Sequence, residues 1–372
     1  MEFSEKEVYK WWKTGYNRFS LCLDCEIPVL GTAMRRKPEG FAACGKNLGE
    51  VLAMEEIKMY IGIDLGGTNI AVGLVDNEPK IVAQASRPTG AERPYQEIAR
   101  DMAELCKEVT ENAGYTMADI QGIGVGSPGA IDSKEGVIVF ANNLNWHNVP
   151  LIAELKKYYP EIPMTVENDA NAAAYGEYVV NGDGAESFLA ITLGTGVGGG
   201  IVLDKRIYRG FNGAGGEIGH FTLVHDGEYC TCGKNGCWEA YASVTALIRQ
   251  TEAAMKANPD SLMVQKADEK GHVSGRTAFD AAKAGDAAAQ QVVDQYLEYV
   301  ADGISSVINI FQPKVLVIGG GISKEGDYIL KPIQAYIDRY TYCKDIPQTE
   351  LKIATLFNDA GIIGAALASV ME

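Results

Sequence analysis

The 372-residue chain contains no apolar run long enough to span a membrane, and its start lacks the basic and apolar regions of a signal peptide. It also lacks an excess of basic residues, because 33 Lys and Arg stand against 49 Asp and Glu, a net charge of −16. This charge disfavours nucleic acid or an anionic membrane surface as the main partner. Eight cysteines in a chain of this length fit a reducing cytoplasm better than a disulfide scaffold, so we expect a cytoplasmic location.

The first 58 residues differ from the rest of the chain in charge and in pattern. They hold nine basic and nine acidic residues, so residues 59–372 carry the whole net charge, with 24 basic against 40 acidic residues. They show no sustained hydrophobic period. We hypothesise that residues 1–58 are a non-native or disordered leader, because Gly49-Glu50 can be encoded as a ribosome-binding sequence shortly before Met54. Mass spectrometry of the native protein tests this hypothesis.

From residue 59 onward, segments with strand and helix patterns alternate, which predicts an α/β fold. The chain is 47% hydrophobic and long enough to bury two cores, so we expect two domains. The strand-like segments lie at residues 60–65, 70–75, 80–86, 122–126, 164–167, 188–193, 199–203, 314–318 and 351–356. The helical segments lie at residues 98–109, 151–159, 170–178 and 287–311, near residue 238, and from residue 360 onward.

Two stretches of the chain align with each other without gaps and predict a duplicated core. Residues 61–68 and 189–196 each have the pattern of a strand followed by a glycine turn, and a second strand, ending in Asp76 or Asp204, follows each turn. Glycine lets backbone N–H groups crowd around an anion, because no Cβ blocks the approach and φ can be positive. A tight hairpin turn is the plain alternative for one such pair. Two matched copies favour phosphate binding.

One short glycine-rich segment, residues 216–239, combines one imidazole with three thiols. His220, Cys230, Cys232 and Cys237 have the spacing of a closed four-ligand metal site. Soft thiolates with one imidazole are the ligands that zinc selects, whereas a redox-active CxC pair or simple buried cysteines are the alternatives. Because four protein ligands leave no position open for water, we predict a structural zinc with no catalytic role.

Six motifs in the chain after residue 58 resemble those of one protein family, in the family's order. They occupy residues 64–68 (Asp-Leu-Gly-Gly-Thr), 167–174 (Glu-Asn-Asp-Ala-Asn-Ala-Ala-Ala), 193–200, 213–220, 230–239 and 358–365. The family is the ROK family of sugar kinases and repressors, and within it the chain is most similar to the glucokinases of Gram-positive bacteria.

This resemblance implies the actin-like ATPase fold, which is related to ribonuclease H, with two α/β domains and an interdomain cleft that binds ATP and sugar. We therefore expect an N-terminal domain over residues 59–175 and a C-terminal domain over residues 176–359, which includes the zinc loop. A last helix, residues 360–372, is expected to return to the N-terminal domain.

The resemblance also implies roles for individual residues. Asp169, at a helix start where exposed N–H groups stabilise a carboxylate, would accept the proton of the sugar hydroxyl that attacks the γ-phosphate; a simple N-cap is the plain alternative. Asp64 would orient the Mg²⁺ of MgATP through water. The sugar would be bound by Gly129, Asn143, Asn168, Glu217, His220 and Glu239. ATP would be bound by Asp64, Gly66, Gly67, Thr68, Asn69, Gly194, Thr195, Gly196, Gly319, Gly320 and Gly321.

The activity that the resemblance implies is the ATP-dependent phosphorylation of glucose at its 6-hydroxyl, with ATP, Mg²⁺ and a structural Zn²⁺ as bound groups. Two alternatives share these motifs: a kinase for fructose, mannose or N-acetylmannosamine, and a sugar-responsive transcriptional repressor. The leader lacks a clear helix–turn–helix pattern and Asp169 is present, which favours a kinase. The family implies a homodimer or homotetramer, and we expect no nucleic-acid or membrane partner. The sequence leaves open the preferred sugar and whether polyphosphate can replace ATP.

Overall fold

The computed structural model describes residues 57–267 and 271–370. The chain divides into two units, Met1–Met54 and Glu55–Glu372, and the described residues belong to the second unit. The hypothesis that residues 1–58 form a leader therefore concerns a segment that, apart from its last two positions, lies outside the described residues.

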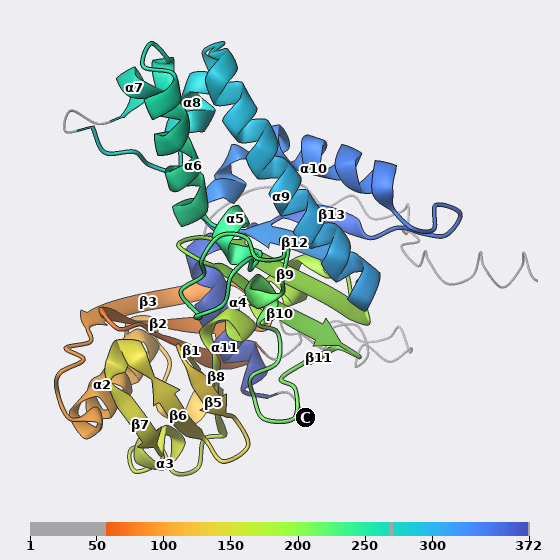
Figure 1. Ribbon diagram of the computed structural model, residues 1–372. Helices are drawn as coiled ribbons and strands as arrows, with labels where there is room; N and C mark the ends of the chain where they lie inside the picture. Colours follow the sequence, from red (N-terminus) through yellow and green to blue (C-terminus); the bar gives the residue numbers. More distant parts are fainter. Residues whose placement is uncertain (1–56, 268–270, 371–372) are drawn as a thin grey trace, which may run out of the picture. The chain divides into compact units, whose positions relative to one another are not determined.

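The first half of the described chain forms a five-stranded sheet with the strand order β3-β2-β1-β4-β8 (Figure 1). Strand β1 (Met59–Leu65) pairs antiparallel with β2 (Asn69–Asp76), which pairs antiparallel with β3 (Ile81–Pro88). On the other side of β1, strands β4 (Ile120–Ser127) and β8 (Met164–Asn168) run parallel to it. The carboxyl ends of β1, β4 and β8 therefore meet at one edge of the sheet.

Two helices cover the two faces of this sheet. Helix α2 (Tyr95–Asn112) packs on β2 and β3, and its buried apolar side chains share a core with those of β1. Helix α11 (Ala360–Ala368) lies against β1 and β4 on the other face. Gly62 and Gly124 permit this close approach, because a Cβ added to either would lie 1.8 Å from a carbonyl oxygen of α11. Helix α11 thus completes a core that β1 begins.

The second sheet has the strand order β11-β10-β9-β12-β13 and repeats the pairing pattern of the first. In both sheets a central hairpin extends into a third antiparallel strand, and two further strands run parallel on the opposite side. Its strands are β9 (Ser187–Leu193), β10 (Val197–Leu203), β11 (Arg206–Ile207), β12 (Val315–Gly319) and β13 (Glu350–Ile353). The predicted α/β fold with a duplicated strand–turn–strand core is confirmed.

Helices also cover both faces of the second sheet (Figure 1). Helix α4 (Asp169–Asn181) packs on β9 and β10 from one side. Helix α9 (Ala287–Phe311), which spans the predicted residues, contributes to the large core on the other side. The remaining helices of this half are α5 (Glu239–Ala242), α6 (Val244–Ala257), α7 (Leu262–Lys266), α8 (Thr277–Lys283) and α10 (Asp327–Tyr340).

Helices α4 and α11 pack directly against each other, and glycines make the contact possible. A Cβ added to Gly364 would lie 1.7 Å from a carbonyl oxygen of α4, and one added to Gly176 would lie 2.3 Å from a carbonyl oxygen of α11. The buried carboxylate of Glu177 accepts hydrogen bonds from the backbone N–H groups of Thr355 (3.2 Å) and Leu356 (2.9 Å). Helix α4 therefore also fixes the segment through which the chain enters α11.

The sequence patterns do not predict a third, small sheet with the order β5-β6-β7. Its strands are β5 (Ala130–Asp132), β6 (Val137–Ala141) and β7 (Trp146–Val149). These strands are too short to show a period, and Asn145 and Asn148 adopt left-handed conformations that interrupt the segment. Helices α6, α7, α8 and α10 were not predicted either, and helix α3 (Leu151–Leu155) ends four residues before the predicted end at residue 159.

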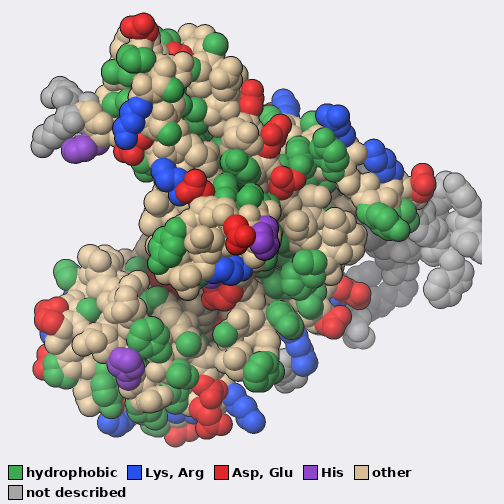
Figure 2. All heavy atoms as spheres, in the orientation of Figure 1, with side chains coloured by type: hydrophobic (Ala, Val, Ile, Leu, Met, Phe, Trp, Pro, Cys, Tyr) green, Lys and Arg blue, Asp and Glu red, His purple; other side chains and the backbone are tan. Residues whose placement is uncertain are grey.

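The surface of the described residues carries side chains of mixed character. Figure 2 shows acidic, basic and apolar side chains interspersed over the face drawn, so on this face the negative charge is not gathered into one patch. Among residues 57–267 and 271–370, no helix combines the length and the apolar character needed to cross a membrane.

Candidate active site

The predicted general base lies at the junction of β8 and α4. The side-chain oxygen of Asn168 accepts hydrogen bonds from the backbone N–H groups of Ala170 (3.0 Å) and Asn171 (3.2 Å), so Asn168 is the N-cap of α4. Its amide nitrogen donates a hydrogen bond to the carbonyl oxygen of Gly129 (3.2 Å). Asp169 is the first residue of the helix, and its side chain reaches solvent. The Oδ1 atom of Asp169 also accepts a hydrogen bond from the backbone N–H of Ala170 (2.9 Å), so its other carboxylate oxygen remains available for chemistry.

Asp64 and Asp169 come from different elements, and the structure brings them close enough to interact. Surrounding protein atoms partly desolvate the Asp169 carboxyl and raise its pKa, although backbone N–H groups at the start of α4 oppose this effect. Burial also raises the pKa of Asp64, the penultimate residue of β1, and the negative charge of Asp169 adds to the increase. A carboxylate with a raised pKa is a better proton acceptor, and a pair of carboxylates favours a cation nearby.

The two predicted phosphate turns close the hairpins of the two sheets. In the first turn, the N–H of Gly66 donates to the carbonyl oxygen of Asn69 (2.9 Å), while Thr68 and Asn69 are exposed. Gly67 lies against Asn143, because an added Cβ would be 2.8 Å from the Asn143 carbonyl oxygen. The second turn, which includes Thr195, is closed by a bond one residue shorter, from the N–H of Gly194 to the carbonyl oxygen of Gly196 (3.0 Å).

The predicted adenosine loop follows β12, which is the parallel neighbour of β9. Gly320 has φ +87°, and an added Cβ would lie 2.3 Å from the carbonyl oxygen of Leu193, the last residue of β9. Gly319 and Gly321 flank this position. The structure therefore brings the adenosine loop beside the second phosphate turn, because neighbouring parallel strands end at the same edge of the sheet.

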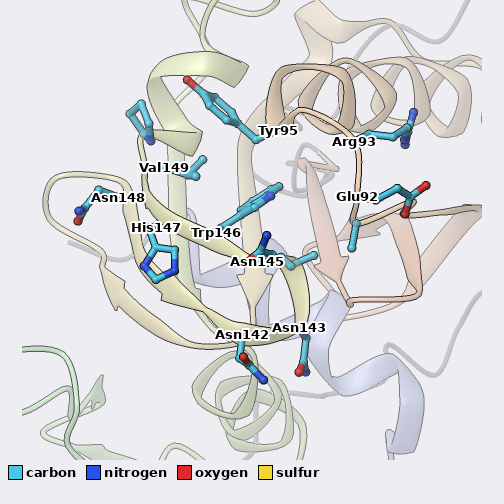
Figure 3. A pocket seen from close by; sticks show the side chains of 13 residues that line it. Glu92, Arg93, Tyr95, Asn142, Asn143, Asn145, Trp146, His147, Asn148 and Val149 are labelled. Carbon is cyan, nitrogen blue, oxygen red and sulfur yellow. The ribbon is translucent and has the colours of Figure 1, made fainter.

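Asn143 belongs to the short 3₁₀ helix η3 (Asn142–Leu144) and contributes to the lining of a cavity of about 670 Å³. Figure 3 shows this cavity between Tyr95 and Trp146 on one side and Asn142 and Asn143 on the other. Gly129, which bonds to Asn168, has φ +103° and could not carry a side chain, since a Cβ would lie 2.0 Å from a carbonyl oxygen of β6.

The two predicted acidic sugar ligands differ in their surroundings. Glu239 begins α5, and its Oε2 accepts a hydrogen bond from the backbone N–H of Val197 (2.9 Å), directly after the second phosphate turn. Gly196 lies against the same carboxylate, because an added Cβ would be 2.3 Å from it. Glu217 is exposed, and within the described part of the chain its carboxylate has no hydrogen bond or ion pair. The structure thus joins Glu239 to the phosphate turn and leaves Glu217 open to solvent.

The four predicted metal ligands form one cluster. The ligand atoms of His220, Cys230, Cys232 and Cys237 all lie within 4.8 Å of one another. Cys230 Sγ is 3.6 Å from His220 Nδ1, and Cys232 Sγ is 3.5 Å from Cys237 Sγ. Ligands of a tetrahedral zinc with bonds of about 2.3 Å stand about 3.8 Å apart, so the cluster has the right size for the ion. Burial raises the pKa of the Cys237 thiol to about 12, and metal binding would therefore displace a proton there.

Sequence reasoning missed an ion pair beside this site, between Glu167 at the end of β8 and Arg209 after β11. It also missed the hydrogen bond that connects Glu239 to Val197. A charged residue at the end of a predicted strand is a signal that could have drawn attention to Glu167. No comparable signal identifies Arg209, because its partner is 42 residues away in the sequence.

Comparison with known proteins shows where similar chains have been characterised. The model of the family described as "ROK family" matches residues 60–370. The glucokinase of Halalkalibacterium halodurans is 39% identical over 309 residues, which cover 82% of this chain and 93% of that protein. The solved structure of a ROK family glucokinase from Streptomyces griseus in complex with glucose and AMPPNP is 34% identical, with a TM-score of 0.68 over 83% of this chain and 98% of that one. A xylose repressor of Caldicellulosiruptor bescii is 28% identical and is covered over 77% of its length.

Proposed function

This chain belongs to the ROK family, and on that premise we propose that it is a glucokinase, which transfers the γ-phosphoryl group of MgATP to the 6-hydroxyl of glucose. The observation that carries the proposal is the position of Asp169, whose carboxylate is exposed at the start of α4, bonds through one oxygen to the N–H of Ala170, and interacts electrostatically with Asp64. The greater similarity to glucokinases than to repressors supports a kinase.

In this proposal Asp169 accepts the proton of the attacking hydroxyl, and its raised pKa suits it to that role. Asn168 and Gly129, joined by a hydrogen bond, would bind the sugar together with Asn143, and Glu217 and Glu239 would accept hydrogen bonds from its hydroxyls. Charged acceptors discriminate strongly between sugars that differ in the position of a hydroxyl group.

The two hairpin turns would hold the phosphates of ATP. Backbone N–H groups of residues 66–69 and 194–196 can approach an anion closely because glycines line both turns. Residues 319–321 would contact the adenosine, and Asp64 would orient Mg²⁺ through water. Phosphoryl transfer then depends mainly on positioning and on the neutralisation of charge. We place this site in a cleft between domains that comprise residues 59–175 and 176–359.

We further propose that the cysteine cluster holds a structural zinc. His220 presents Nδ1 to the sulfur atoms, which leaves Nε2 free to donate a hydrogen bond to a sugar hydroxyl. With four protein ligands, the ion supplies rigidity and no bound water. The cluster would hold His220 and the neighbouring Glu239 in fixed positions around the sugar.

An ATP-coupled assay with glucose, mannose, fructose and N-acetylmannosamine tests the activity. We expect the highest kcat/KM with glucose and no turnover by the Asp169→Asn variant. If no sugar is phosphorylated and the protein instead binds DNA in a sugar-dependent way, the proposal is wrong. We also propose a cytoplasmic homodimer or homotetramer, which sedimentation equilibrium can test.

A further inference from the structure

One ion pair, with a buried carboxylate, joins the segment of Asn168 and Asp169 to the loop that leads to Glu217 and His220. Glu167 is 4% exposed and directly precedes Asn168 and Asp169. Its Oε2 accepts a hydrogen bond from Nε of Arg209 at 2.5 Å. Arg209 begins the loop of residues 209–216, which leads directly to the proposed sugar ligands of the second half. The pair therefore connects the end of β8 to a segment from the other sheet.

The Glu167 carboxylate also holds the first turn of α4. Its Oε1 accepts hydrogen bonds from the backbone N–H of Asn168 (3.0 Å) and from the side-chain amide of Asn171 (3.1 Å). A carboxylate with so little exposure is unfavourable unless a cation compensates its charge. Among the described residues, Arg209 is the ion-pair partner that does so. Glu167 is thus fixed on one side to the proton acceptor's helix and on the other to Arg209.

The loop of residues 209–216 needs such an anchor. Gly210, Gly213 and Gly216 have φ of +69°, +81° and +95°, and glycine-rich backbone loses more entropy on ordering than any other. The carbonyl oxygen of Arg209 accepts a hydrogen bond from the N–H of Gly215 (2.9 Å), which closes the loop on itself. Gly213 lies against β5, because an added Cβ would be 2.4 Å from a carbonyl oxygen of that strand. The ion pair adds a fixed point at the start of the loop.

We propose that Glu167 and Arg209 form a positioning pair, which sets the location of Asn168 and Asp169 relative to the loop of residues 209–216 that leads to Glu217. Neither residue of the pair is among those proposed to contact the sugar or the phosphates. The inference rests on the proposed function, because it concerns where the proton acceptor lies with respect to the sugar. The pair has no bond to either phosphate turn, so its loss should affect the sugar and leave ATP binding intact.

The test compares the variants Arg209→Gln, Glu167→Gln and the double variant. Because a displacement of about 1 Å at a reacting centre can cost about 100-fold, we expect kcat/KM for glucose to fall by at least about 30-fold in each. The KM for ATP should stay within about twofold of the wild type, and the double variant should lose no more than the worse single variant, as residues that act together do.

Arg87→Gln provides a matched control. Arg87 pairs with the buried Asp101, and the two side chains are 35% and 8% exposed, against 38% and 5% for Arg209 and Glu167. This control removes an arginine from a buried carboxylate outside the proposed sugar site, where Asp101 keeps its ion pair with Arg93 (2.7 Å), and we expect its kinetic constants for glucose to match those of the wild type.

Three results would overturn the inference. One is a loss in Arg87→Gln as large as that in Arg209→Gln, the second is an equal loss for glucose and ATP, and the third is additivity in the double variant. If circular dichroism shows that Arg209→Gln does not fold, the kinetic constants of Arg209→Lys replace it as the test. Lysine keeps the positive charge but lacks the planar geometry of the guanidinium group. A partial loss confined to glucose supports the inference, and no loss or a loss shared with ATP overturns it.

The proposed function and the proposed positioning pair can fail independently, and separate measurements distinguish the two failures. If the wild-type protein phosphorylates no sugar, the proposed function fails, and calorimetric binding of glucose then tests the pair without turnover. Weaker glucose binding by Arg209→Gln than by Arg87→Gln would still support the pair, whereas equal binding, or no binding by the wild type, would overturn it.

Discussion

The close contact between α4 and α11 predicts that Gly364→Ala destabilises the protein. The added Cβ would lie 1.7 Å from a carbonyl oxygen of α4, whereas ordinary contacts begin at 3.4 Å, so the atoms must separate by a further 1.7 Å. Overpacking a core lowers the free energy of unfolding by about 1–3 kcal/mol, and an overlap of this size should cost a value near the upper end of that range. Replacing Gly by Ala within a helix returns about 1 kcal/mol, which leaves a net loss of about 2 kcal/mol in the free energy of unfolding.

Thermal unfolding followed by circular dichroism measures this loss. A change of 1 kcal/mol shifts the midpoint by about 2–4 °C in a domain of 150–250 residues, so we expect Gly364→Ala to melt about 4–8 °C below the wild type. Gly361→Ala is the matched control in the same helix, because its nearest contact is at 3.6 Å, to Asp64 Cγ, and needs no movement. A Gly364→Ala midpoint equal to or above that of the wild type would refute the reasoning, as would an equal loss in the control.

The remaining predictions concern the proposed site. Asp169→Asn should lower kcat by about 10²–10⁴-fold, the usual contribution of a general base, while calorimetric glucose affinity changes little; near-normal turnover would contradict the assignment. Because the pKa of Asp169 is raised, kcat should fall with decreasing pH at a higher pH than an ordinary aspartate would give, which a pH–rate profile can show. The same raised pKa means that folding favours the protonated form, so the stability present below the unfolded pKa is lost as pH rises through the folded pKa. Asp169→Asn should therefore raise the melting temperature at pH 7 but not at pH 3. The reverse pattern would contradict a raised pKa of Asp169 in the folded protein. Removal of metal by a chelator, checked by elemental analysis, should raise the KM for glucose more than the KM for ATP; equal changes in both would argue against a role of the cluster in holding His220.

Local patterns explain which parts of the fold and site the sequence predicts. Helix α9 is predictable to the residue because its apolar positions keep a helical period over seven turns, and Asp286 caps its start. The zinc cluster is predictable because its four ligands lie within 18 residues of one another. The matched strand–turn–strand copies predict the hairpins of both sheets.

Other features depend on contacts that no local pattern contains. Glu167 and Arg209 meet only because β8 and the segment after β11 are brought together by tertiary packing. The sequence also does not decide between Asn168 and Asp169 as the cap of α4, since both residue types cap helices well. The β5-β6-β7 sheet consists of strands too short for alternation to show.

The position of α11 has a consequence for synthesis on the ribosome. Strands β1 and β4 emerge early, but the face that contains Gly62 and Gly124 is covered only by the last helix of the chain. Translation at about 5–20 residues per second leaves that face uncovered for many seconds while the second sheet is made. The N-terminal sheet is therefore expected to remain a substrate for chaperones until α11 has emerged from the ribosome, and a nascent chain stalled before residue 360 should bind them more than one that includes α11.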